Sequence, residues 1–137
     1  MEYRKIEFPG DYQCDFRADT GSRYSIVDLR TYRLQILAAA HMARKTSLIW
    51  DIGIPADAAS VTHGFPAYCD PCRTYPVLKG ASILCRADNS PVRLQFLVVD
   101  FKPRKAPVLI LGIDNLTVLD FEFDSDPELE LVLSQME

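Results

Sequence analysis

The chain has 137 residues, 48% of them hydrophobic, and a formal net charge of −4. This length is sufficient for one sizeable core and short for two, so the sequence predicts a single domain over residues 1–137. The acidic balance argues against general nucleic-acid binding, which requires a basic surface. We therefore expect no nucleic-acid partner.

The hydrophobic stretches are too short to predict a membrane protein. The apolar run at 36–43 is interrupted by His41 and falls short of the ~18 residues that a membrane-spanning helix needs. Residues 1–8 alternate charged and apolar side chains and lack the apolar core of a signal peptide. The expectation is a cytoplasmic or nuclear protein that has no membrane partner, with its cysteines, at positions 14, 69, 72 and 85, present as thiols.

The first part of the chain predicts short strands and one helix. Alternating or β-branched residues predict strands at 2–8, 12–18, 24–29 and 47–52. The first of these is expected to be an edge strand that ends at the Pro9-Gly10 turn. Residues 31–44 are rich in helix formers and contain neither glycine nor proline, which predicts a helix.

The second part begins with a segment, 53–80, that has four prolines and no sustained apolar period, which predicts an extended, turn-rich excursion. The segments that follow have clearer patterns. We expect a hairpin of 81–87 and 92–101 around a turn at 88–91, a basic loop at 102–107, a buried strand at 108–111, a helical turn at 116–119, and strands at 120–123 and 128–133.

Asp19 is followed by Thr20 and Gly21 between the strands predicted at 12–18 and 24–29. A strand that ends in such a turn presents its carboxylate at a bend, and glycine lets the backbone approach closely. Taken alone, Asp-x-Gly is ordinary turn chemistry. A second observation is therefore needed to favour a catalytic role.

That observation is the sequence Ile110-Leu111-Gly112-Ile113-Asp114, which follows the turn by about ninety residues. Together the two segments resemble the retropepsin-like aspartic proteases of retroviruses and retrotransposons, which pair an Asp-Thr-Gly turn with an Ile-Leu-Gly-x-Asp-x-Leu element. The resemblance implies an all-β fold with short helices, in which each chain forms one lobe, a half-barrel, of a homodimer. Ile110, Leu111 and Gly112 would form an element beside the substrate cleft. Gly112 would let a neighbouring chain pass closely beneath the site, and Asp114 would cap the short helix that follows.

The resemblance also implies an activity, that of an aspartic endopeptidase. Such enzymes need two facing carboxylates, and this chain has one Asp-Thr-Gly turn, so two copies of Asp19 would meet across a twofold axis. Thr20 would anchor the turn to the opposing loop, and the Gly21 N–H would support the carboxylate. A Ser22 hydroxyl donating to that carboxylate would lower the pKa of the pair.

By the same resemblance, the excursion at 53–80 falls where the family places its flap, the hairpin that folds over the substrate. We take His63, Gly64 and Phe65 as flap candidates. The expected partner is a protein or peptide substrate bound as an extended strand and read by alternating side-chain pockets. No cofactor is expected.

Two alternatives stay open from the sequence. The fold could serve as a catalytically silent dimerisation or peptide-binding module, because an intact Asp-Thr-Gly turn permits both functions. Cys69 and Cys72 form a CxxC pair, but the spacing of Cys and His fits neither a zinc finger nor a zinc knuckle. We therefore expect loop thiols and no metal site, with a metal-binding adaptor as the remoter reading.

Overall fold

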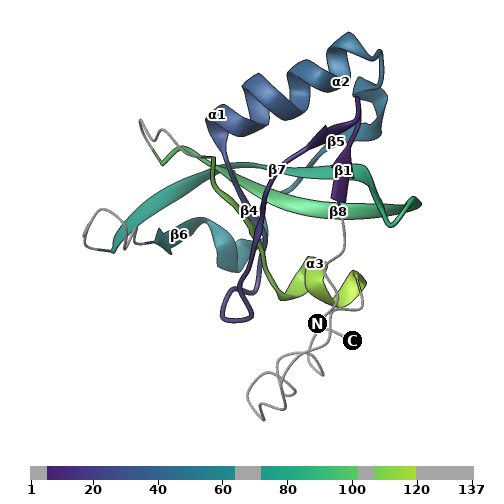
Figure 1. The fold of residues 1–137 in the computed structure, drawn as a ribbon. Coiled ribbons are helices and arrows are strands. Elements are labelled where there is room, and N and C mark those ends of the chain that lie inside the picture. Colours follow the sequence, from purple (N-terminus) through teal and green to yellow (C-terminus); the bar gives the residue numbers. More distant parts are fainter. Residues whose placement is uncertain (1–5, 64–71, 102–106, 120–137) are drawn as a thin grey trace.

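The computed structural model describes residues 6–63, 72–101 and 107–119, which form a mostly β-structure with a curled, half-barrel sheet (Figure 1). The described strands are β1 (Ile6–Phe8), β2 (Tyr12–Gln13), β3 (Arg17–Ala18), β4 (Ile26–Asp28), β5 (Ile49–Ile52), β6 (Ser60–His63), β7 (Arg73–Ala87), β8 (Ser90–Val99) and β9 (Leu109–Leu111). The described helical segments are α1 (Leu29–Thr31), the π-helical η1 (Tyr32–Leu37), α2 (Ala38–Met42), the 3₁₀ turns η2 (Thr46–Leu48) and η3 (Ala56–Ala58), and α3 (Ile113–Val118). The expected class, all-β with short helices, is confirmed at this level.

The long strand β7 organises the sheet. One of its sides pairs with β8, and the other pairs in succession with β6, β5 and β1. The register with β8 shifts between Val77 and Lys79, where β7 passes from β6 to β5. Such a bulge bends a strand and increases its twist, which helps β7 to pair with different strands in succession along one side while β8 pairs along the other.

β7 also corrects two predictions. It starts at Arg73, so the last part of the excursion expected at 53–80 is regular strand. The turn that follows β7 consists of Asp88 and Asn89, both with positive φ, and β8 begins at once at Ser90. Two residues with positive φ match the right-handed twist of a hairpin. The turn therefore has two residues, where four had been predicted.

The predicted helix is confirmed, although it runs without a break from Leu29 to Met42 through α1, η1 and α2. It starts where β4 ends, because the Asp28 carboxylate accepts the Thr31 N–H at 3.0 Å. Its buried hydrophobic side chains recur every four residues, at Tyr32, Ile36 and Ala40. The helix lies over one side of the sheet in Figure 1, and Tyr32 and Ile36 pack in a core cluster with residues of β4, β7 and β8.

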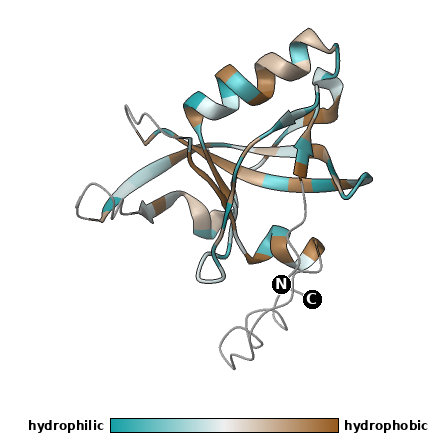
Figure 2. Cartoon of the chain, viewed as in Figure 1, coloured by the Kyte–Doolittle hydropathy of each residue, from teal (hydrophilic) through white to brown (hydrophobic). Residues whose placement is uncertain are grey.

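The central strands β4 and β9 and the last part of β8, residues 96–99, are buried on both faces. Neighbouring residues along each strand join opposite core clusters: Val27 packs in one and Ile26 in the other, and Leu111 and Ile110 divide in the same way. Figure 2 shows hydrophobic colour along these strands. A near-continuous apolar sequence suits such a position, as predicted for 108–111.

Other predictions change at the sheet margin. β1 lies between β2 and β7 and is therefore not an edge strand. The strand expected at 12–18 is divided into β2 and β3, and the helical turn expected at 116–119 starts earlier, as α3. The basic loop at 102–107 and the C-terminal strands at 120–123 and 128–133 fall largely or wholly outside the described residues.

Candidate active site

The Asp-Thr-Gly turn leaves the sheet where β3 ends. β9 lies between β3 and β4, parallel to the first and antiparallel to the second. The strands on either side of the turn therefore flank the strand that carries the second motif. The Asp19 N–H donates to the Leu111 carbonyl at 2.9 Å. The fold thus brings the two sequence motifs into direct contact.

Backbone groups hold the turn and its carboxylate. The Gly21 N–H donates to Asp19 Oδ1 at 3.0 Å, which is the contact expected for Gly21. The Ser22 N–H donates to the Asp19 carbonyl at 3.1 Å. Asp19 is half-buried, while Thr20 and Gly21 are exposed. The turn therefore presents a fixed, accessible carboxylate, and the contact of Thr20 with an opposing loop stays a prediction because it requires a second chain.

Gly112 is the point of closest approach between the two motifs. A Cβ at this position would lie 2.5 Å from the Tyr24 carbonyl oxygen and 2.7 Å from that of Ser22. Its φ of −86° is accessible to any residue, so space and not backbone conformation demands glycine. The sequence-based expectation that Gly112 lets a neighbouring chain pass closely is confirmed.

A buried polar network lies beneath the turn. The Ser25 side chain is fully buried, and its hydroxyl donates to Asp114 Oδ1 at 2.7 Å while accepting the Gly112 N–H at 2.9 Å. The Asn115 amide donates to the same Ser25 oxygen at 2.8 Å. This hydroxyl therefore connects β4, the end of β9 and α3, the elements that determine where the turn lies.

Asn115 extends the network to β8. Its side-chain amide donates to the Gln95 carbonyl at 2.9 Å and its side-chain oxygen accepts the Gln95 N–H at 3.1 Å, so it occupies both backbone groups of that residue as a neighbouring strand would. Asn115 is 2% exposed. The described residues leave no buried side-chain polar atom without a hydrogen-bond partner.

Asp114 was expected to cap the short helix. It lies instead in the first turn of α3, where Gly112 is the N-cap, and its carboxylate accepts the Asn115 N–H at 2.7 Å besides the Ser25 hydroxyl. Burial raises the pKa of Asp114, and the hydrogen bonds from Ser25 and Asn115 oppose that rise. The Asp114 carboxylate is therefore an acceptor in the buried hydrogen-bond network and not the cap of the helix.

The expectation for Ser22 is wrong. Its hydroxyl donates to the Tyr24 carbonyl at 2.7 Å, so the single hydroxyl proton is already used inside the turn. It does not donate to the Asp19 carboxylate, and the predicted lowering of the pKa of a carboxylate pair by this group loses its basis. Ser22 supports the shape of the turn instead.

The other predicted site residues divide into core and flap positions. Ile110 and Leu111 are buried, 4% and 0% exposed, in opposite core clusters, so they form the scaffold beside the turn and not an open pocket wall. His63 ends β6, whose residues pair with the start of β7, and it lies opposite Arg73. Gly64 and Phe65 lie outside the described residues.

The cysteines of the described residues are free thiols. Cys85 is buried, and its burial raises the thiol pKa to about 12, which suppresses the reactive thiolate. Cys72 is exposed, and its CxxC partner Cys69 lies outside the described residues. Within the described ranges, no three His, Cys, Asp or Glu side chains gather as metal ligands would.

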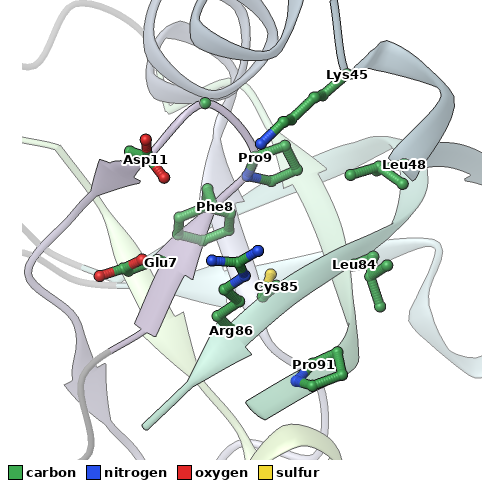
Figure 3. Close-up of a pocket in the computed structure, with 11 residues that line it drawn as sticks. Glu7, Phe8, Pro9, Asp11, Lys45, Leu48, Leu84, Cys85, Arg86 and Pro91 are labelled. Carbon is green, nitrogen blue, oxygen red and sulfur yellow. The ribbon is translucent and has the colours of Figure 1, made fainter. Parts of the chain in front are cut away.

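A pocket of about 150 Å³ lies on another part of the molecule, between the β1–β2 turn, η2 and the β7–β8 hairpin (Figure 3). None of its lining residues belongs to the Asp-Thr-Gly turn. Its rim carries Lys45 and Arg86 together with Glu7 and Asp11, so positive and negative charges balance. The pocket therefore has no charge selectivity that would identify a ligand.

No protein-family model matches the chain, and no relative is found among curated proteins. None of the helices in the described part of the chain is long and apolar enough to cross a membrane. Because no family or relative was found, the role of the Asp-Thr-Gly site rests on its geometry. Ser25 and Asn115 lie within the two sequence motifs, but the sequence predicted no role for either, because the type and spacing of a Ser or Asn do not reveal its hydrogen-bond partners.

Proposed function

We propose that this chain is one half of an aspartic endopeptidase, with Asp19 as its catalytic carboxylate. One observation supports this above all others: the Asp-Thr-Gly turn is braced by the Ile-Leu-Gly strand, with Asp19 N–H bonded to Leu111 and Gly112 packed beneath the turn. An ordinary Asx turn would need no such support. The bracing holds a half-buried carboxylate in one position, which is what a group that must meet a second carboxylate requires.

The proposed site needs two chains. A single Asp-Thr-Gly turn supplies one carboxylate, and a symmetric homodimer would bring two copies of Asp19 together. Two carboxylates held close together cannot both ionise cheaply, so they would share one proton, as in the general example of aspartic proteases. The pair would then titrate with two separated apparent pKa values.

This shared proton provides an acid and a base from one residue type. The ionised Asp19 would take a proton from the attacking water, and the protonated Asp19 of the other subunit would donate its proton to the oxygen of the scissile carbonyl. The product of this step is a neutral tetrahedral diol bound between the carboxyl groups. No covalent acyl-enzyme forms, because water and not a side chain attacks.

The substrate would be a peptide in extended conformation. The β6 and β7 segments pair as the arms of a hairpin, Ser60 opposite Pro76 and His63 opposite Arg73, at the position expected for a flap. An extended peptide held between such a hairpin and the Asp19 turn offers alternate side chains to opposite walls. Cleavage would therefore depend on several substrate residues on each side of the bond.

The test is cleavage of a mixed peptide library by the wild-type protein and by Asp19→Asn, at acidic and neutral pH. The Asn side-chain oxygen still accepts the Gly21 N–H, so the turn should keep its shape while the acid–base group is lost. We expect cleavage to fall at least about 10²-fold. Asp15→Asn, the same change at an exposed position between β2 and β3, is the matched control and should cleave normally.

Equal cleavage by the wild-type protein and Asp19→Asn would overturn the proposal. Absence of cleavage by the wild-type protein at every pH, with measurable binding of an extended peptide, would favour the silent peptide-binding module instead.

A further inference from the structure

Asp57 contacts the segment that leaves the Asp-Thr-Gly turn. Its Oδ1 accepts the Tyr24 hydroxyl at 2.8 Å, and its Oδ2 accepts Arg23 Nη1 at 3.2 Å. The Arg23 guanidinium also lies 5.8 Å from the centre of the Tyr24 ring. Two neighbouring side chains that follow the turn therefore meet one carboxylate from a distant part of the sequence.

The segment around Asp57 is in turn fixed to the base of the β6–β7 hairpin. Asp57 lies in η3, and the next residue, Ala58, is 3% exposed in a core cluster with Tyr75 and Val77 of β7. The Val77 N–H donates to the Ala59 carbonyl at 2.9 Å. A displacement of Asp57 would therefore be transmitted to the hairpin.

We propose that Asp57 is a positioning residue that couples the base of the β6–β7 hairpin to the Asp19 turn. The consequence for catalysis rests on the proposed function, since the hairpin would then set the height of the cleft above Asp19. The mechanical coupling does not depend on it. Asp57 is thus expected to influence substrate binding without touching the reacting atoms.

The exposure of these groups supports a geometric role and not a stabilising one. The side chains of Arg23 and Asp57 are each 55% exposed, and ion pairs in such positions contribute little to folding. The Asp57 carboxylate positions two donors, because one of its oxygens accepts from Tyr24 and the other from Arg23. Tyr24 is the better anchor, because its side chain also packs against the core cluster that contains Ala58.

The first experiment measures hydrogen exchange of the β6 amides, residues 60–63, in the wild-type protein and in Asp57→Ala. We expect exchange to become about two- to fivefold faster, the range that corresponds to loss of exposed polar contacts. Tyr24→Phe should have part of this effect, and the double variant should not exceed Asp57→Ala. The matched control is Asp51→Ala, which removes an exposed carboxylate of β5 that is bound to Lys79 of β7. It should leave the exchange rates of the β6 amides unchanged.

Unchanged β6 exchange in Asp57→Ala would overturn the coupling, whatever the activity of the protein. The second readout is steady-state peptide cleavage, in which Asp57→Ala should raise KM about threefold or more while kcat changes less than about twofold. An unchanged KM in a protein that cleaves peptides would overturn the positioning role. A protein without any cleavage would reject the proposed function, while the exchange experiment would still decide the coupling.

Discussion

The Ser25 hydroxyl makes three hydrogen bonds in a space that water does not reach. It donates to Asp114 and accepts from the Gly112 N–H and the Asn115 amide. Ser22, in the Asp-Thr-Gly turn, makes one side-chain hydrogen bond, to the Tyr24 carbonyl, and is only half-buried. Replacing each serine by alanine therefore compares the loss of a hydroxyl at a buried position with its loss at a half-buried one.

Ser25→Ala should lower the free energy of unfolding by about 2 kcal/mol, because it leaves the buried Gly112 N–H without its acceptor and removes one donor from the Asp114 carboxylate. Ser22→Ala should lower it by about 1 kcal/mol or less, since one partly exposed bond is lost. Urea denaturation of the two variants and the wild-type protein measures the difference. Equal losses would show that the Ser25 network does not support the fold.

The Asp114 carboxyl should make stability depend on pH in a defined direction. Burial raises its pKa above the ordinary value of 3.8, so the folded protein holds the proton more tightly than the unfolded chain does. The contribution of this group is therefore most favourable below pH 3.8 and falls as the pH rises through the raised pKa.

We expect the stability of the wild-type protein relative to Asp114→Asn to decrease as the pH rises from below 3.8 through the raised pKa of Asp114. Denaturation midpoints of both proteins across this range measure the difference, in which the contributions of the other carboxylates cancel. A relative stability that does not change with pH, or that rises, would contradict the assignment.

Among the strands around the site, the closest contact is the passage of the turn over Gly112. β9 lies between β3 and β4, and the backbone of Ser22 and Tyr24 crosses it where Gly112 ends the strand. The Ile113 N–H donates to the Ser22 carbonyl at 2.8 Å, which fixes this crossing. A side chain at Gly112 would have to push the turn away.

Gly112→Ala should therefore destabilise the protein by about 1–3 kcal/mol, as overpacking does elsewhere. It should also reduce peptide cleavage if Asp19 is catalytic, because the turn must shift. Gly53→Ala is the matched control, since a Cβ there meets nothing within 4 Å, and it should leave both properties nearly unchanged. Thermal unfolding measures the stability of both variants, and peptide cleavage assays measure their activity. An unchanged Tm for Gly112→Ala would refute the close packing.

The proposed function requires that two chains share one site. Each chain offers one partly exposed carboxylate on a braced turn. If each active dimer needs an Asp19 from both chains, then a mixed dimer with one Asn in place of Asp19 has lost either the acid or the base. Subunit mixing therefore reports on the shared site directly.

Adding excess Asp19→Asn protein to a fixed amount of wild-type protein should reduce peptide cleavage, approaching zero as mixed dimers replace wild-type ones. At equal amounts and random exchange, half of the wild-type subunits remain paired with each other. The same addition of Asp15→Asn protein should not reduce cleavage. If inactive subunits leave the rate unchanged after full exchange, each chain acts alone and the shared site is refuted.

The sequence alone predicted much of the scaffold around the site. The helix near 31–44, the apolar strand at 108–111 and the hairpin that contains 81–87 follow from local periodicity and turn residues, which act over a few positions. The close approach at Gly112 was also expected. The full length of β7 was missed, because Pro76 and a bulge near Leu78 interrupt the pattern while the pairing with β6 and β8 sustains the strand.

The periodicity of the strands and the helix and the order of the two motifs could be predicted before the fold was known, because these properties depend on residues that are neighbours along the chain. The contacts between distant polar groups became evident only in the folded chain: Ser25 with Asp114 and Asn115, and Asp57 with Tyr24. Such partners have no local signature, since their contact depends on the register of strands far apart in the sequence. For the same reason the Ser22 hydroxyl, placed by motif beside the carboxylate, was found bonded to Tyr24 once the path of the turn was fixed.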